Sequence, residues 1–192
     1  MKKIQMVDLK GQYSSIKEVV NSSIQEVIDN ASFINGPKVK EFQANLEAYL
    51  GIKHVIPCAN GTDALQIAMM GLGLKPGDEV IVTNQDHEAN ISPWRRLKEV
   101  GAIIKEWKIN PKTAELEIET FESLLTDKTK IVAVTHCSNI VGTVNDLKKI
   151  SDLAHKKNAI VIGDGVSFAP HGFPDVKELG VDFYTFSLYK TY

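Results

Sequence analysis

The chain of 192 residues has only two cysteines, and it lacks long apolar runs and an excess of charge of either sign. Cys58 and Cys137 form no CxxC motif, so the sequence indicates neither a disulfide framework nor a metal centre, and a reducing cytoplasm is the expected location. No apolar stretch follows the N-terminal lysines, and no run is long enough to span a membrane. A net charge of −2 offers no basic field to nucleic acid or an anionic membrane. We therefore expect a small-molecule ligand.

Short apolar runs alternate with amphipathic segments along most of the chain. The spacing predicts strands at residues 55–59, 79–83, 102–107, 131–135, 159–163 and 182–186. It predicts helices at residues 62–70, 119–125 and 147–157. This alternation is typical of an α/β fold in which a doubly wound, mostly parallel sheet has helices on both faces.

Two helical patterns precede the first expected strand. Apolar residues recur at helical spacing after Ser14 and Ser15, and a second pattern begins at Pro37 and ends at Gly51. No repeat, low-complexity stretch or flexible linker interrupts the sequence. We therefore expect an N-terminal helical arm over residues 1–52 and one α/β domain over residues 53–192.

Polar residues follow the expected strands, and ligands of open α/β sheets bind at the carboxyl ends of strands. Gly61 and Thr62 open a helix whose free N–H groups can hold a phosphate, with an ordinary helix cap as the simpler alternative. His87 in the segment DHEAN can stack flat on a ring, and Asn139 in the segment THCSN offers an amide. A hydrogen-bonded turn residue is the alternative for both. The adjacent His-Cys of THCSN does not indicate a metal, because neighbours on a strand point to opposite faces.

Asp164 and Lys190 together suggest a cofactor. Asp164 follows the apolar run of residues 159–163, and Lys190 follows the run of residues 182–186, three residues after Ser187. A lysine can form an imine with the aldehyde of pyridoxal 5'-phosphate (PLP), and a carboxylate can pair with the pyridine nitrogen. Ser187 could donate to the phosphate, and Lys190 could move a substrate's Cα proton. A helix cap is the alternative for Asp164.

From about residue 84 onward, the chain resembles class V aminotransferases, the group that includes cysteine desulfurases and selenocysteine lyases. The matching segments are DHEANISPW, AVTHCSNIVGT, AHKKNAIVIGDG and DFYTFSLYKTY. The resemblance implies that His87 stacks on the PLP ring, that Asn139 lies near the cofactor hydroxyl or the substrate, and that Asp164 pairs with the pyridine nitrogen. It also implies that Ser187 binds the phosphate and that Lys190 is the Schiff-base lysine.

Residues 1–83 resemble a second family, the DegT/DnrJ/EryC1/StrS sugar aminotransferases. The matching segments are MVDLKGQY, FINGPKVKEFQANLEAYLG and CANGTDALQIAMMGLGLKPGDEVIV. This resemblance implies that Gly61 and Thr62 contact the cofactor phosphate. Both families have the fold of type I PLP-dependent transferases. The sequence therefore resembles a large domain of that fold in which one family continues into the other near Val82.

The leading functional hypothesis is a PLP-dependent, aminotransferase-like enzyme. It would transfer an amino group from a small-molecule donor to a sugar or amino-acid acceptor through the Lys190 Schiff base, and the resemblance implies a homodimer. A cysteine desulfurase or selenocysteine lyase is the alternative, although many desulfurases have DGAQ where this chain has DGVS, and a histidine in place of Tyr189. Cys137 does not supply their catalytic thiol, because it belongs to the THCSN strand end.

The position of Lys190 leads to a third alternative. By resemblance, a further strand and a C-terminal domain follow this lysine, whereas the sequence ends two residues later. An inactive truncated or fused remnant, poorly soluble or oligomeric because a sheet edge is unpaired, is therefore kept as a hypothesis. A dinucleotide-binding Rossmann protein is disfavoured because no GxGxxG motif follows a strand.

Overall fold

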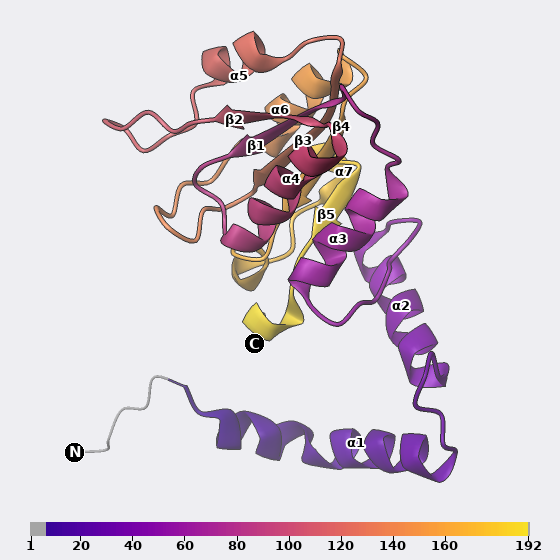
Figure 1. The fold of residues 1–192 in the computed structure, drawn as a ribbon. Coiled ribbons are helices and arrows are strands. Elements are labelled where there is room, and N and C mark those ends of the chain that lie inside the picture. The colour runs from indigo at the N-terminus through magenta and orange to yellow at the C-terminus, as the bar shows by residue number, and fades with distance from the viewer. Residues whose placement is uncertain (1–6, 192) are drawn as a thin grey trace, which may run out of the picture. The chain divides into compact units, whose positions relative to one another are not determined.

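The computed structural model describes residues 7–191, and the chain forms two compact units that divide between Pro57 and Cys58 (Figure 1). The first unit contains two helices, and the second contains a five-stranded sheet with its flanking helices. The expected arm of residues 1–52 and the expected domain of residues 53–192 stay predictions. Residues 1–6 and 192, which both expectations include, lie outside the described part.

Helices α1 (Leu9–Asp29) and α2 (Pro37–Leu50) make up the first unit. Pro37 lies in the first turn of α2, where its missing N–H costs no helical hydrogen bond, and Gly51 ends the helix with a φ of 62°. Both ends agree with the sequence pattern. Neither helix contains a buried residue, so the apolar stripes of α1 and α2 contribute little to a hydrophobic core.

The start of α1 differs from the expectation. The helix begins at Leu9 because Asp8 caps it, accepting a hydrogen bond from the N–H of Gly11 at 2.9 Å. Ser14 and Ser15 therefore lie inside the helix rather than before it. Their hydroxyls donate to backbone carbonyls about one turn earlier, at 2.8 and 2.7 Å, which satisfies them without ending the helix.

Residues 55–59 do not form the expected strand. A strand needs a neighbour that completes its ladder of hydrogen bonds, and no strand within residues 7–191 pairs with this segment. Pro57 has no N–H to donate. The N–H of Val55 instead donates to the carboxylate of Glu47 at 3.0 Å, within the first unit.

Five parallel strands form the sheet in the order β2-β1-β3-β4-β5, which confirms the expected α/β fold. Each of them begins and ends within two residues of its expected position. The strands are β1 (Glu79–Thr83), β2 (Ile103–Trp107), β3 (Thr129–Thr135), β4 (Ile160–Asp164) and β5 (Phe183–Thr185).

Helices cover both faces of this sheet (Figure 1). One face packs on α3 (Gly61–Gly71) and α4 (Ser92–Arg96), and the other packs on α5 (Ile118–Leu124) and α6 (Leu147–His155), with α7 (Val176–Leu179) against α6. Within residues 58–191, four short 3₁₀ helices complete the unit: η1 (Glu88–Asn90), η2 (Leu97–Val100), η3 (Ala169–His171) and η4 (Leu188–Lys190). None of the helices in residues 7–191 combines the length and apolar character that crossing a bilayer requires.

Alternate side chains of the central strands enter the two cores. Ile81 and Val132 pack with α5 and α6, whereas Val80 and Ile131 pack with α3 and α4, and all four are fully buried. This pattern follows from the period of two along a strand. It explains why the strands appear in the sequence as continuous apolar runs, as is typical of a parallel sheet covered on both faces.

The strand register gathers the carboxyl ends of the strands at one edge of the sheet. Thr135 of β3 pairs with Asp164 of β4, which in turn pairs with Thr185 of β5. The direction in which strands are added reverses between β1 and β3, the place where open α/β sheets form a ligand crevice. Polar side chains after β1, β3 and β4 therefore lie where a ligand would bind.

Candidate functional site

Asp164 ends β4 as a buried carboxylate with 5% of its surface exposed. Its Oδ1 accepts a hydrogen bond from the N–H of Val166 at 3.0 Å, and no lysine or arginine within residues 7–191 forms an ion pair with it. Burial raises the pKa of Asp164, and the hydrogen bond from Val166 and the attraction of His87 oppose that shift. A cationic ring nitrogen at this position would meet an acid that no lysine or arginine in residues 7–191 pairs with.

Gly165 allows the chain to pass close to an aromatic ring after Asp164. A Cβ at Gly165 would lie 2.1 Å from Cζ of Tyr184, a distance that a well-packed ring cannot accommodate. The Tyr184 hydroxyl lies 2.9 Å from Nδ1 of His136, whose ring stacks on Phe168 with 3.7 Å between centroids. Burial lowers the pKa of His136 to about 4, so this imidazole is neutral near pH 7. The ring cluster gives the loop after β4 a rigid support.

The start of α3 lies beside the segment that follows β5. A Cβ at Gly61 would lie 3.5 Å from Cγ2 of Val166 and 4.0 Å from Cβ of Ser187. Asn60 caps the helix by accepting from the N–H of Asp63 at 2.9 Å. The first N–H groups of a helix have no partner inside it, and Ser187 lies beside the residue that begins this helix. Gly61 and Ser187 are therefore neighbours, as a shared phosphate site requires.

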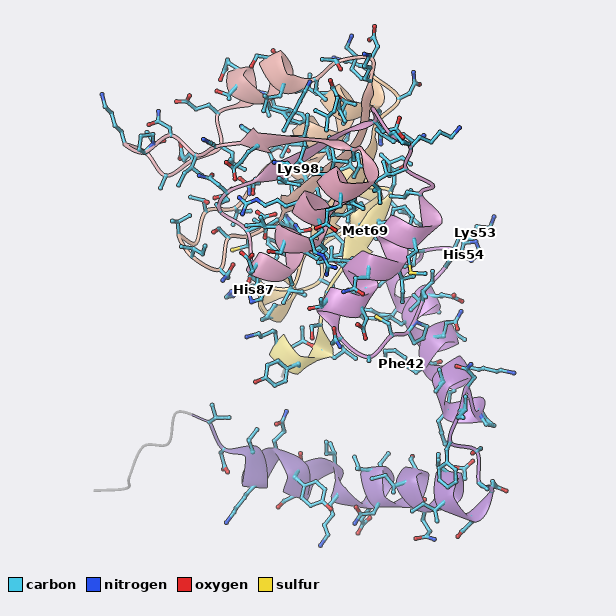
Figure 2. All side chains as sticks on the ribbon, in the orientation of Figure 1. Phe42, Lys53, His54, Met69, His87 and Lys98 are labelled. Carbon is cyan, nitrogen blue, oxygen red and sulfur yellow. The ribbon has the colours of Figure 1, made fainter. Side chains whose placement is uncertain are left out.

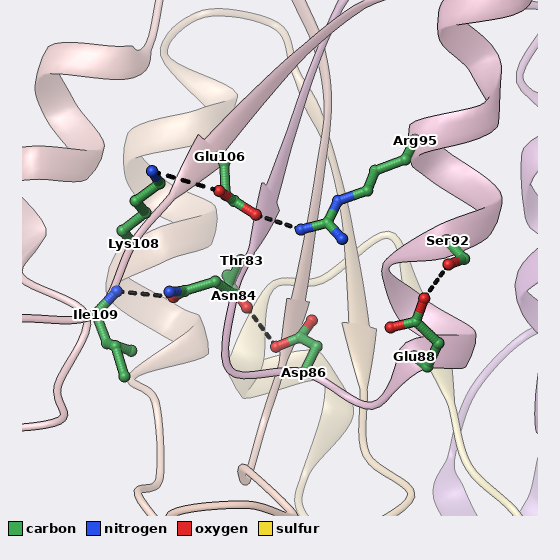
Figure 3. Close-up of polar contacts among 9 residues, drawn as sticks. All are labelled: Thr83, Asn84, Asp86, Glu88, Ser92, Arg95, Glu106, Lys108 and Ile109. Atoms are coloured by element: carbon green, nitrogen blue, oxygen red, sulfur yellow. Dashed lines mark hydrogen bonds and ion pairs between the residues drawn. The ribbon is translucent and has the colours of Figure 1, made fainter.

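His87 lies on the turn after β1, and its side chain is exposed (Figure 2). Its Nδ1 accepts a hydrogen bond from the N–H of Ala89 at 3.1 Å, and its carbonyl accepts from the N–H of Asn90 at 2.8 Å. The preceding residue, Asp86, is only 2% exposed and accepts from the Thr83 hydroxyl (Figure 3) and from Nδ2 of Asn90 at 2.7 Å. The turn that carries His87 is thus hydrogen-bonded at both of its ends.

Lys190 is less constrained than these residues. It is the last residue of η4, it is exposed, and its Nζ lies 5.3 Å from the centroid of the Tyr189 ring. Asn139 is exposed in the loop after β3. Within residues 7–191, the side chains of Thr62, Asn139 and Lys190 make no hydrogen bond or ion pair with Asp164 or with each other.

The structure thus brings together some of the expected residues but not all of them. Gly61 lies beside Ser187, and His87 is close enough to Asp164 to lower its pKa. The backbone N–H of Lys190 donates to the carbonyl of Ser187 at 3.1 Å, but within residues 7–191 the side chains of Thr62, Asn139 and Lys190 make no hydrogen bond with another expected residue. The roles of all seven residues in cofactor binding stay predictions.

Sequence reasoning did not identify three residues of this edge: Asp86, His136 and Tyr184. Asp86 lies in a polar segment that is typical of a turn, and no neighbouring residue in the sequence indicates that its side chain is buried. His136 and Tyr184 are 48 positions apart, so only the strand order brings them together. The one usable signal was position relative to an apolar run: Tyr184 lies in one, His136 directly follows one and Asp86 comes three residues after one.

The family model for class V aminotransferases (Aminotransferase class-V) matches residues 7–192. The aminotransferase-like protein FGM3 of Gibberella zeae is 48% identical over 148 residues, which is 74% of this chain and 36% of that protein. A crystal structure of a DegT/DnrJ/EryC1/StrS aminotransferase from Brucella abortus has a TM-score of 0.68 and 29% identity, covering 85% of this chain and 44% of that one. The apo cysteine desulfurase of Thermococcus onnurineus has a TM-score of 0.70 and 26% identity, covering 76% and 37%.

The similarities therefore include both groups that the sequence resembles, and the family match runs across the expected join near Val82. The chain spans less than half the length of these three proteins. The matched range includes every strand of the sheet and the whole carboxyl edge described above. This chain belongs to the class V aminotransferase family.

Proposed function

We propose that this chain binds PLP and forms the cofactor-binding part of an aminotransferase-like enzyme acting on small molecules. The observation that carries this proposal is Asp164, a buried acid at the ligand-binding edge with no lysine or arginine paired to it in residues 7–191. A protonated pyridine nitrogen fits such an acid in charge and in hydrogen bonding. Membership of the class V family supports the same cofactor.

Five residues would bind the cofactor phosphate, its ring and the ring hydroxyl or substrate. Gly61 and Thr62 begin a helix of 11 residues whose dipole favours an anion at their N–H groups, and Ser187, which lies beside Gly61, would add its hydroxyl. His87 would stack on the ring from the turn after β1. Asn139 would donate to the ring hydroxyl or to the substrate.

The remaining two residues would serve the reaction itself. Bound PLP supplies an electron sink that makes the Cα–H bond of an amino substrate acidic. Asp164 would keep the ring nitrogen protonated. Lys190 would hold the cofactor aldehyde covalently and, once a substrate amine replaces it, would accept the Cα proton and return it. Its exposure leaves the amine accessible to a ligand.

Absorption spectroscopy tests the proposal. Adding PLP to the purified chain should produce the visible band of a lysine adduct, and Lys190→Ala should abolish it. Lys177→Ala is the matched control, because Lys177 is an exposed lysine on α7, on the opposite face from α3, and should leave the band unchanged. No band in the parent chain would favour the inactive remnant, and a band that persists in Lys190→Ala would contradict the assignment of this lysine.

A cysteine desulfurase or selenocysteine lyase is the second candidate, and the similarity to the Thermococcus onnurineus enzyme favours it. Cys137 is half-buried after β3, with its Sγ 3.9 Å from the carbonyl of Gly142. Release of alanine from cysteine without formation of a keto acid would select this candidate over amino transfer, with the released sulfur measured as sulfide after reduction by an added thiol. We also propose a homodimer in the cytoplasm, where the free thiols of Cys58 and Cys137 would stay reduced. Sedimentation of the purified chain tests the dimer.

A further inference from the structure

Asp86 occupies the switch point of the sheet, and none of the roles above uses it. Its carboxylate accepts from the Thr83 hydroxyl at the end of β1 and from Nδ2 of Asn90 at 2.7 Å in η1. The backbone of Thr135, at the end of β3, also stabilises the ionised form of this carboxylate. Asp86 is 2% exposed, and Thr83 and Asn90 are fully buried. One acid therefore joins two strand ends to the turn between β1 and α4.

The hydrogen bonds continue from this turn to α4. Oδ1 of Asn90 accepts from Nε1 of Trp94 at 3.1 Å, and Trp94 is fully buried among the residues of the core under α3 and α4. Asn90 thus uses its amide nitrogen toward Asp86 and its amide oxygen toward Trp94. The short segment that contains His87 is tied to the sheet on one side and to the packed helix on the other.

His87 is an exposed residue of this otherwise anchored turn. Its Nδ1 is engaged by the N–H of Ala89, so the neutral ring carries its proton on Nε2 and is held in one orientation. When this ring is protonated, its positive charge lowers the pKa of Asp164, the acid proposed to face the ring nitrogen. A stacking residue must be held at a fixed height and angle over a ring, and an exposed turn without anchors would not do this.

We propose that Asp86 is a positioning residue that holds the His87 imidazole in the orientation needed for stacking on the cofactor ring. The inference rests on the proposed function, because it concerns the same site. A simpler role, in which Asp86 only stabilises the β1 end, predicts that its loss weakens cofactor binding independently of His87. The two roles therefore differ in whether changes at the two residues are additive.

A double-mutant cycle on the full chain separates the two roles. The apparent dissociation constant of PLP is measured by absorption for the parent, Asp86→Ala, His87→Ala and the double variant. Each single change should weaken binding about tenfold, and the double variant should also lose about tenfold rather than about a hundredfold. A full hundredfold loss in the double variant would overturn the inference while leaving the proposed function intact.

Two further variants control for charge and for general damage to the turn. Asp86→Asn keeps a group that can donate to the Thr83 hydroxyl and accept from Asn90, so it should restore binding to within about threefold of the parent. Ser92→Ala removes only the contact with exposed Glu88 (Figure 3), on the same turn, and should leave binding unchanged. Failure of Asp86→Asn to restore binding would contradict a positioning role based on hydrogen bonds.

Hydrogen exchange of the cofactor-free chain provides a readout that does not depend on PLP. The N–H groups of Ala89 and Asn90 both donate to His87, so their exchange reports the geometry of this residue directly. Exchange at these two amides should be at least about tenfold faster in Asp86→Ala than in Asp86→Asn. Equal exchange in both variants would overturn the inference. If the parent chain gives no PLP band, the proposed function is overturned. Amide hydrogen exchange alone would then test whether Asp86 positions His87.

Discussion

The two sides of the candidate site are held in different ways. On the side of β1, β3 and β4, Asp86 and Asp164 are 2% and 5% exposed and are hydrogen-bonded by the turns that contain them. On the side of β5 and η4, Ser187 caps no N–H with its side chain, and Lys190 is exposed beside Tyr189. The fold therefore holds the carboxylates of Asp86 and Asp164 in position, whereas it leaves the amine of Lys190 free to move. Recognition of the cofactor ring and its covalent attachment can accordingly be tested separately.

The largest expected effect comes from filling the space at Gly165. In Gly165→Ala, the new Cβ would lie 2.1 Å from Cζ of Tyr184, so the ring cluster under Asp164 must shift. We expect the free energy of unfolding to fall by about 3 kcal/mol or more, because overpacking of a rigid aromatic site is costly. Chemical denaturation monitored by circular dichroism measures this. In the matched control Gly71→Ala, the new Cβ meets nothing within 4 Å, and stability should not decrease.

Asp164→Asn separates stability from binding. The amide removes a buried charge, so the cofactor-free chain should become more stable by about 1 kcal/mol. The affinity for PLP should fall by about a hundredfold, because the ring nitrogen loses its charged acceptor. Denaturation and absorption titrations measure the two effects. A parallel loss of stability and affinity would contradict the account, and exposed Asp182→Asn should leave PLP affinity unchanged.

A smaller effect is expected in the pH dependence of stability. Burial, opposed by the Thr83 hydrogen bond and strengthened by the charge of Asp164, raises the pKa of Asp86 from 3.8 to about 7. The folded state therefore binds this proton more tightly than the unfolded state does. Its contribution to the free energy of unfolding is fully present below pH 3.8 and is lost as the pH rises to about 7.

Asp86→Asn removes this titration. The free energy of unfolding of the variant, relative to the parent, should increase by on the order of 2 kcal/mol between about pH 4 and pH 7.5. His136 acts with the opposite sign: burial lowers its pKa from 6.5 to about 4, so its contribution is lost as the pH falls through that window. His136 is present in both chains and cancels in the difference. Denaturation curves at a series of pH values that show a constant difference would contradict a buried, titrating Asp86.

The parts of the fold that could be predicted from sequence are those with a local cause. Continuous apolar runs mark strands buried on both faces, and Asp164 was found because it directly follows such a run. Residues 55–59 have the same apolar character but form no strand, since pairing depends on a distant neighbour. Asp86 was missed for the same reason, because its burial follows from the approach of β3 to β1.

The most direct test of the account is the identity of the lysine that PLP modifies. The full chain is incubated with PLP, reduced with borohydride and digested, and the modified peptide is located by mass spectrometry. The account predicts the adduct on Lys190, with little on exposed lysines such as Lys177, and a loss of that adduct in Asp164→Asn at limiting PLP. An adduct spread over several surface lysines, or its absence from Lys190, would contradict the account.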